Sequence, residues 1–432
     1  MTHQNQAAAP VLFNKDPERL VTRKRVITKR AVMWLGQTCN QRCWFCYFID
    51  AISNPHSPEH AFMTLEKAKA ICHVLRTFYD NTSIDIQGGE PTIFPGILDL
   101  VHYCREIGLY PTLITNGIAL AKPGVLEKYK EAGIRDFLVS LHGLREIHDE
   151  VVCKKGAYEK IAAAIDGMRE VGIPFRYNCT MSKPVIPILP EIAQHAIDHG
   201  ARVVNFIHFN PFRDQTGKVT PQGVERYRVI KPQLTEAVDL LESHGIEANV
   251  RYLPLCMVEE RHRKNVYNWQ QLSYDTHEWD LESWLWTMMG PQMTREGHIS
   301  PPFRLGPWAR AFACGDYRKS RQRYEQNSVV EKGKYYLQRR IARLTQALVG
   351  KETLLRREAK IRVKTDLQYV HGAPCQKCAA RDICDGFHKD YVTLFGFEEA
   401  SPIQAATPIT DPLHYIQHQE KIVEPEDRHW AL

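Results

Sequence analysis

The sequence has no long hydrophobic run. Its apolar stretches are far shorter than the ~20 residues of a membrane-spanning helix, and the mean hydropathy is −0.38. The first ten residues are polar and then alanine-rich, without the charged-then-apolar order of a signal peptide. Glycine and proline number only 25 each among 432 residues, and no repeat or low-complexity tract occurs, which excludes collagen-like and linker-dominated chains. We therefore expect a cytoplasmic protein that does not contact membranes.

Strand-like and helix-like segments alternate from residue 32 to about residue 210. Short apolar segments that end at glycine or asparagine alternate with stretches in which apolar residues recur at helical spacing. Six such strands predict a parallel array that is too short for a complete eight-unit barrel. We predict an α/β fold, a partial (β/α)6 barrel of the TIM type, with a further strand possible at 249–253. A mostly helical C-terminal extension would carry a second cysteine cluster.

Composition divides the chain into five expected parts. An N-terminal basic arm (1–31) precedes the barrel (32–250). An insertion with basic helices (251–365) and a segment with the second cysteine cluster (366–400) follow, and the chain ends in a C-terminal tail (401–432).

The insertion contains a strongly basic stretch. Residues 319–364 hold 14 Lys and Arg against 4 Asp and Glu, a net charge of +10. Leu337, Ile341, Leu344 and Leu348 have the spacing of an amphipathic helix. The simplest interpretation is a helix that covers the barrel and turns its charges to solvent. A site for an anionic substrate or partner is the alternative.

Three of the twelve cysteines lie within eight residues, directly after the first predicted strand. Cys39, Cys43 and Cys46 have the spacing C-x3-C-x2-C, which gathers three thiolates around one centre. Three thiolates cannot complete a structural zinc site, which needs four ligands, whereas a 4Fe–4S cluster can accept three and keep one iron open. The loop lies at the carboxyl end of a barrel strand, where barrel enzymes place their chemistry. The spacing therefore predicts a catalytic cluster with an open iron.

This cysteine motif, with the aromatic Phe45 before its last cysteine, resembles the radical S-adenosylmethionine (SAM) superfamily. A second element, QGGEPT at 87–92, follows the second predicted strand and resembles the family's GGEPT element. The resemblance implies that Gly88, Gly89 and Glu90 position the methionyl amine of SAM, since glycine allows a close backbone approach and a carboxylate accepts from an ammonium group.

Two later elements agree with this resemblance. Asn116 follows the third predicted strand in the sequence TNG, as in many members. Ser140 begins the sequence SLHG after the fourth strand, which resembles a family turn, SLDG, whose serine meets the cofactor. Asn178 shares one face of the fifth strand with Thr180 and is a further candidate cofactor contact.

The sequence also departs from the family pattern in two places. His142 replaces the aspartate of the SLDG turn. Many relatives carry an arginine shortly after a His-Asp pair, but here the pair at 148–149 is followed by Val151 and Val152. The resemblance therefore leaves the residue that contacts the SAM carboxylate unassigned.

A second group of cysteines lies near the C-terminus. Cys375, Cys378 and Cys384 are followed by His388 in the pattern C-x2-C-x5-C-x3-H, which on spacing alone fits a Cys3His zinc site. The pattern also resembles the C-terminal SPASM or twitch extension of radical SAM enzymes, which implies an auxiliary 4Fe–4S cluster. Cys314, in a Cys-Gly sequence typical of these extensions, is the expected fourth ligand. The alternatives are Cys256 and His388.

Polar residues near the end of the sixth predicted strand are candidate substrate contacts. His208, Asn210 and Arg213 lie at or just past its carboxyl end, at the catalytic rim of such a barrel. A structural role in the loop is the alternative.

The resemblance implies an oxidoreductase-type radical SAM enzyme. Such an enzyme would cleave SAM reductively to a 5′-deoxyadenosyl radical and abstract a hydrogen atom from its substrate, which leads to oxidation, epimerisation or rearrangement. A small flavodoxin- or ferredoxin-type protein would donate the electron, and the auxiliary cluster would accept an electron or bind substrate. Only about thirty residues precede the barrel, too few for a separate peptide-recognition domain. We therefore expect a small organic substrate, anionic if the basic stretch contacts it, rather than a peptide.

Other functional classes remain as alternatives. A peptide- or protein-modifying maturase would take its recognition from a partner. A non-catalytic iron–sulfur or zinc protein would have no need of a glutamate after a double glycine. Nucleic acid is not an expected partner, because the basic stretch lacks the aromatic and basic interleaving of an RNA-binding module.

Overall fold

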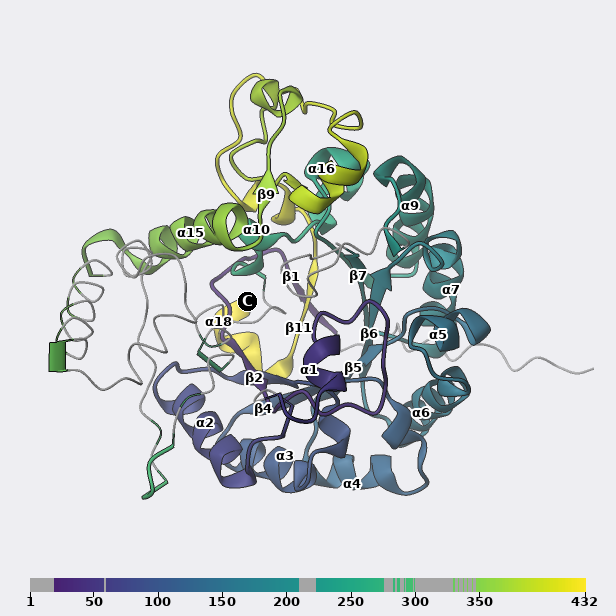
Figure 1. Ribbon diagram of the computed structural model, residues 1–432, viewed down its shortest axis with the longest axis vertical. Coiled ribbons are helices and arrows are strands. Elements are labelled where there is room, and N and C mark those ends of the chain that lie inside the picture. Colours follow the sequence, from purple (N-terminus) through teal and green to yellow (C-terminus); the bar gives the residue numbers. More distant parts are fainter. Residues whose placement is uncertain are drawn as a thin grey trace, which may run out of the picture.

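The computed structural model describes residues 19–57, 60–209, 223–275 and 347–432, together with isolated positions between 283 and 344. Its centre is a curled sheet of seven parallel strands in sequence order, with helices along its outer side (Figure 1). The strands are β2 (Arg30–Trp34), β3 (Ser83–Gln87), β4 (Tyr110–Thr115), β5 (Asp136–Ser140), β6 (Phe175–Met181), β7 (Val203–His208) and β8 (Glu247–Arg251).

Helices cross between successive strands, as parallel pairing requires. The crossover helices are α2 (Leu65–Thr77), α3 (Ile97–Glu106), α4 (Val125–Ala132), α5 (Arg145–Val151), α6 (Ala157–Val171), α7 (Leu189–His199) and α9 (Tyr227–Ser243). The predicted partial parallel barrel is confirmed. It has seven strands rather than six, because the segment expected at 249–253 forms a full strand at 247–251.

The two faces of the sheet differ in character. One set of alternating positions, such as Ile84 and Leu113, is fully buried in the apolar core shared with the helices. The other set carries buried charges that pair with each other across strands. Arg30 lies 3.1 Å from Asp85, and further ion pairs of this kind join the middle strands. Charged side chains rather than apolar ones therefore occupy part of the barrel interior.

The C-terminal segment returns to the barrel. It contains α17 (Leu413–Ile416), β11 (Lys421–Val423) and α18 (Arg428–Ala431), and β11 pairs antiparallel with β1 (Leu20–Thr22). The Lys421 ammonium lies 2.6 Å from Glu247 and 2.9 Å from Asp275, and all three side chains are buried. Because Glu247 begins β8, this segment covers the amino-terminal end of the barrel.

The extension lies beside the carboxyl end of β8. It contains α10 (Trp269–Leu272), α15 (Lys351–Ile361), the antiparallel pair β9 (Tyr369–Val370) and β10 (Phe387–His388), and α16 (Lys389–Phe395). In Figure 1, β9 and α16 lie together beyond α10.

The apolar face expected on the basic helix is not buried against the barrel. Leu337, Leu344 and Leu348 are 60%, 63% and 84% exposed, so that expectation is wrong for these positions. Ile341 lies outside the described residues. No helix in the described part of the chain has both the length and the apolar character needed to cross a membrane.

Candidate functional site: two cysteine centres

The first cysteine centre is the loop between β2 and the short helix α1 (Ile49–Ser53). Cys39, Cys43 and Cys46 are half-buried there, at the carboxyl end of the sheet. Burial raises the pKa of Cys39 to about 11, and nearby Cys46 contributes to that rise. Burial also raises the pKa of Cys43, with further contributions from Cys46 and Cys39. The three thiols therefore share one small region of the loop.

This arrangement fits an iron–sulfur cluster better than a single metal ion. Among the described residues, no group of three or more His, Cys, Asp or Glu side chains surrounds a position for one ion. Zinc needs four ligands close to one point, whereas cysteines of a 4Fe–4S cluster are spread over its iron atoms. The buried Nε2 of Gln41 and Oε1 of Gln37, in the same loop, have no hydrogen-bond partner within the described residues. Such orphaned polar atoms indicate an additional bound group.

The double glycine after β3 allows two loops to approach closely. The Gly89 N–H donates to the Gly36 carbonyl at 2.8 Å. A Cβ atom on Gly88 would lie 2.3 Å from the Gly36 oxygen, and one on Gly89 would lie 2.1 Å from the Thr38 oxygen. Both distances are far inside van der Waals contact, so only glycine fits. The GGE sequence is therefore required for the loop after β3 to lie against the cysteine loop.

Glu90 connects this loop to the next strand. Its Oε1 accepts from the Thr92 N–H at 3.0 Å and from the Thr115 hydroxyl at 2.6 Å, and its Oε2 accepts from the Asn116 N–H at 2.7 Å. Burial raises the pKa of Glu90, which is 1% exposed, and these hydrogen bonds oppose the rise. Oε2 still has room to accept a further bond. Glu90 therefore positions the loop as well as offering an acceptor to a ligand.

The other predicted cofactor contacts lie around the same rim. The Asn116 amide donates to Asn40 Oδ1 at 2.7 Å and lies 4.0 Å from the Cys39 sulfur. Ser140, the last residue of β5, is the register partner of Asn178 in the middle of β6, and both are half-buried.

His142 and His148 form a stacked pair beside Phe45. The ring centroids of Phe45 and His142 are 4.7 Å apart, and those of the two histidines are 6.5 Å apart. The Thr180 N–H donates to His142 Nδ1 at 3.1 Å, and the His142 N–H donates to His148 Nδ1 at 3.2 Å. In the neutral rings the proton is therefore on Nε2. Burial lowers the pKa values to about 3 and about 4, respectively. His142 therefore presents a neutral Nε2–H donor at the position where the SLDG turn has the acceptor carboxylate of aspartate.

Sequence reasoning missed Lys154. Its ammonium donates to the Asn40 carbonyl at 2.9 Å, inside the cysteine loop. The Trp44 N–H donates to the Val151 carbonyl at 3.4 Å and ties the end of α5 to the same loop. Cys153 has a φ of 54°, in the left-handed region, and this turn precedes Lys154. The signal in the sequence is a lysine five residues after the His-Asp pair at 148–149.

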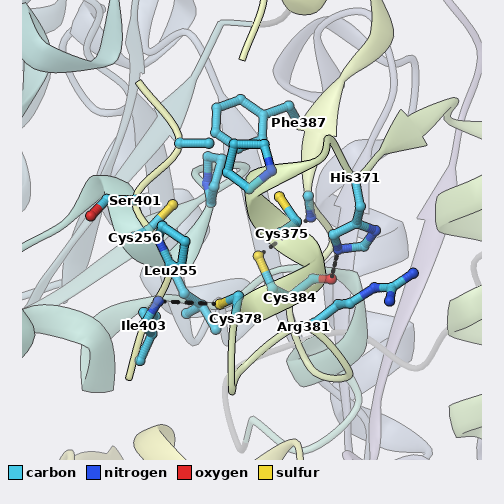
Figure 2. A pocket seen from close by; sticks show the side chains of 15 residues that line it. Leu255, Cys256, His371, Cys375, Cys378, Arg381, Cys384, Phe387, Ser401 and Ile403 are labelled. Atoms are coloured by element: carbon cyan, nitrogen blue, oxygen red, sulfur yellow. Dashed lines mark hydrogen bonds between the residues drawn. The ribbon is translucent and has the colours of Figure 1, made fainter. Parts of the chain in front are cut away.

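The second cysteine centre is a small cavity in the extension (Figure 2). Cys256, Cys375, Cys378 and Cys384 all line it, and their four sulfur atoms surround one space. The whole cavity measures about 360 Å³, part of it open to solvent. Cys256 belongs to the turn Leu255–Met257 that follows β8, so the barrel supplies one thiol and the extension three.

Backbone groups hydrogen-bond to the sulfur atoms of this cavity. The Gly386 N–H lies 3.4 Å from the Cys384 sulfur, and the Ile403 N–H lies 3.4 Å from the Cys378 sulfur. Burial raises the pKa of Cys256 to about 11, and a backbone hydrogen bond from Ser401 opposes that rise. Donors directed at sulfur stabilise thiolate ligands and tune iron–sulfur clusters. The cavity therefore fits a cluster with four cysteine ligands.

Of the two other candidate fourth ligands, only His388 lies within the described residues. Cys314 lies outside the described residues. His388 does not line the cavity, and its Nδ1 caps α16 by accepting from the Asp390 N–H at 3.2 Å. The Cys3His arrangement of a zinc site is therefore not formed by the described residues. Cys256, the weaker alternative on sequence, is the thiol that the fold brings to the other three.

Of the three predicted substrate contacts, His208 lies within the described residues. His208 is fully buried against Tyr227, with ring centroids 4.9 Å apart, and Tyr227 in turn stacks on Tyr391 at 4.0 Å. That environment corresponds to the structural alternative for His208. Asn210 and Arg213 lie outside the described residues.

Comparison with known proteins agrees with these observations. Residues 35–196 match the model of the Radical SAM superfamily. The chain therefore has a region, residues 35–196, that is similar to the radical SAM superfamily. That family uses a 4Fe–4S cluster and SAM, which agrees with the predicted resemblance and cofactors. The matched region begins just before the cysteine loop and ends in α7, and thus includes the loops described above.

Curated relatives of two kinds are similar to the chain. An AdoMet-dependent heme synthase of Methanosarcina barkeri is 29% identical over 46% of this chain and 56% of its own length. A PqqA peptide cyclase of Bradyrhizobium diazoefficiens is 30% identical over 27% of this chain and 30% of its own length. The matches therefore span about half or less of these relatives. A crystal structure of Streptococcus suis SuiB bound to S-adenosylmethionine has a TM-score of 0.42 and 18% identity, over 55% of this chain and 52% of that one.

Proposed function

We propose that the chain is an oxidoreductase-type radical SAM enzyme that acts on a small organic substrate. The observation that carries the proposal is the meeting of three thiols and a double-glycine loop at the carboxyl end of the sheet. Cys39, Cys43 and Cys46 would hold the catalytic cluster. When bound, the reduced cluster and SAM supply a 5′-deoxyadenosyl radical that removes a hydrogen atom from substrate.

The surrounding residues would bind and orient SAM. The loop of Gly88 and Gly89 lies against the cysteine loop and offers backbone groups at close range. Glu90, held by the strand ends, would accept from the amine of SAM through Oε2. Ser140 and Asn178 would contact the remainder of the cofactor from neighbouring strands.

Lys154 would hold the carboxylate of SAM. Its ammonium donates to the Asn40 carbonyl and forms no ion pair with a carboxylate of the described residues. An ammonium group has three donors, so two remain for a ligand. A charge-assisted hydrogen bond of this kind fits the carboxylate that the resemblance left without a partner.

Cys256, Cys375, Cys378 and Cys384 would hold an auxiliary 4Fe–4S cluster. Four thiolates occupy all four irons and leave no open position for a substrate. The cavity therefore supports the acceptance of an electron, rather than the binding of substrate, as the role of this cluster. An electron acceptor beside the barrel suits a net oxidation of the substrate.

The substrate class can be tested directly. Anaerobically reconstituted protein would be mixed with SAM, a strong reductant and either the small-molecule or the peptide fraction of a cell extract, and 5′-deoxyadenosine would be measured. We expect the small-molecule fraction to stimulate its formation. Stimulation by peptides alone would support the maturase alternative, to which the similarity with a peptide cyclase points. No 5′-deoxyadenosine from any mixture, with both clusters intact and reducible, would contradict the proposed activity.

A further inference from the structure

A row of exposed aliphatic side chains lies before α15, in the basic stretch of the chain. The described helical positions there are 329, 330, 333, 337, 340, 344 and 347–349. Five of them are more exposed than every other Val, Leu, Ile or Phe that the structure describes: Val329, Val330, Leu337, Leu344 and Leu348, at 85%, 65%, 60%, 63% and 84%. We call these five side chains the aliphatic face.

The aliphatic face is continuous along one side of the helix. Val330, Leu337 and Leu344 are seven residues apart, which is close to two helical turns, so they lie one above the other. Leu348 follows Leu344 by four residues and extends the same row. Arg340 is the one charged residue among the described helical positions, and it too is exposed. The row therefore packs against neither the barrel nor the extension.

Isolated exposed aliphatic residues would need no explanation. Such residues are common on protein surfaces, whereas a contiguous apolar patch marks an interaction site. Here five large aliphatic side chains recur at helical spacing, and each is at least 60% exposed. Contact of this much apolar surface with water is unfavourable, so its burial against a partner would be stabilising. The aliphatic face therefore points to a partner that is apolar where it meets the helix.

The same part of the chain is strongly cationic. Residues 329–348 contain five Lys or Arg and one Glu, a net charge of +4, and the longer stretch 319–364 has a net charge of +10. These net charges already include every carboxylate within the stretch. The partner is therefore expected to be anionic as well as apolar. An apolar face on a basic helix is the composition of helices that lie in a membrane interface.

Two other occupants fit these observations less well. A second copy of the chain would bring two segments of charge +4 together, and like charges repel. The core of a specific protein interface is enriched in aromatic residues and methionine, and the described helical positions contain neither. A lipid surface requires only apolar side chains for its acyl region and positive charge for its headgroups.

We propose that this helix binds the surface of an anionic lipid membrane. The aliphatic face inserts at the boundary between headgroups and acyl chains, and the Lys and Arg residues of 329–348 lie near the lipid phosphates. The sequence predicts no membrane contact because it lacks a spanning segment and a signal peptide, but an interfacial helix needs neither. The proposal does not depend on the proposed radical chemistry.

The test is co-sedimentation of the reconstituted protein with two kinds of vesicle, one of phosphatidylcholine alone and one of phosphatidylcholine and phosphatidylglycerol in equal parts. We expect binding to the anionic vesicles that weakens as the salt concentration rises, and little binding to the neutral ones. The variant L337Q/L344Q should bind the anionic vesicles at least roughly tenfold more weakly, because two of the five inserted side chains become polar. The variant R339Q/R340Q/R343Q should bind more weakly and with a smaller dependence on salt.

The matched control is V229Q/L432Q. It replaces two aliphatic residues that are 45% and 50% exposed elsewhere, and it should bind as the unchanged protein does. Iron content and thermal unfolding check that each variant is folded. If L337Q/L344Q does not fold, L348Q replaces it, since Leu348 is 84% exposed, and it too should bind more weakly.

Three results would overturn the proposal. They are no binding to the anionic vesicles, equal binding to both kinds of vesicle, or unchanged binding by L337Q/L344Q or its replacement. Without vesicle binding, a dimer seen by light scattering that L337Q/L344Q abolishes would assign the aliphatic face to a second copy. Binding to polyglutamate but not to vesicles would assign it to an acidic protein.

Discussion

The two cysteine centres differ in how many thiols they gather and from where. The first takes Cys39, Cys43 and Cys46 from one continuous loop and surrounds them with orphaned polar atoms and a glycine cradle. The second takes Cys256 from the end of the barrel and three thiols from the extension, and directs backbone N–H groups at the sulfurs. An incomplete thiol set leaves room for a ligand, whereas a complete one closes the cluster.

The largest expected effect is the loss of SAM cleavage when a thiol of the first centre is removed. Cys43→Ala should reduce 5′-deoxyadenosine formation by at least ~10³-fold, because a cluster with two thiolate ligands is not retained in the loop. The measurement is 5′-deoxyadenosine by chromatography, with iron content as the second readout. Retention of full SAM cleavage by Cys43→Ala would contradict the role of this loop. Cys153→Ala, an exposed cysteine near the same loop, is the matched control and should be active.

The next effect concerns the second centre. Cys256→Ala should lower the iron content from about eight to about four per chain, since each 4Fe–4S cluster holds four irons. SAM cleavage should persist without formation of the oxidised product, because the electron has no acceptor. Cys314→Ala should leave the iron content unchanged. Loss of iron in Cys314→Ala but not in Cys256→Ala would show that Cys314, as the sequence predicts, is the fourth ligand.

A smaller effect tests the cation beside the first centre. Lys154→Met should weaken SAM binding by roughly 10- to 100-fold, as expected for the loss of a charged hydrogen bond worth about 1.5–3 kcal/mol. The decisive ligand is decarboxylated SAM, whose affinity should not change in this variant. Equilibrium dialysis measures both affinities.

The matched control for this test is Lys155→Met, which removes the adjacent exposed lysine. It should bind both ligands as the unchanged protein does. If Lys154→Met weakens the two ligands equally, Lys154 does not contact the carboxylate. If the unchanged protein binds neither ligand, the proposed cofactor site itself fails.

The smallest expected effect is a pH dependence in the wall of the first centre. The folded pKa of His142 is lowered to about 3, below its ordinary value of about 6.5. The neutral ring therefore contributes stability above pH 6.5 that is lost as the pH falls toward 3. Linkage gives a loss of about 2 kcal/mol between pH 7 and pH 5. In His142→Gln this contribution should disappear, and denaturant unfolding at several pH values measures it. If the free energy of unfolding has the same pH dependence in both proteins, His142 is not its source.

The first centre is accessible to prediction from the sequence because its parts are local. Cys39, Cys43 and Cys46 lie in one loop, and the double glycine follows the next strand, so spacing and periodicity suffice. Six of the seven strands were also predicted, because each lies between helical stripes and places apolar residues on the face that packs against the helices.

The second centre could not be predicted in the same way. Cys256 lies 119 residues before Cys375 (375 − 256), and only the path of β8 and the extension brings the two together. The position of Lys154 depends on a left-handed backbone turn at Cys153, which residue type does not predict. His208 appeared to be a rim residue by its place in the strand, but the aromatic ring of Tyr227 from α9 covers it.

The central claim is that the first cluster is open and the second is closed. The most direct test uses two proteins that each keep one centre, Cys256→Ala and Cys43→Ala, reduced anaerobically and examined by electron paramagnetic resonance with and without SAM. We predict that SAM changes the spectrum of the cluster in Cys256→Ala and leaves that of the cluster in Cys43→Ala unaltered. A SAM-dependent change in Cys43→Ala, or none in Cys256→Ala, would contradict the assignment of an open iron to the loop of Cys39, Cys43 and Cys46.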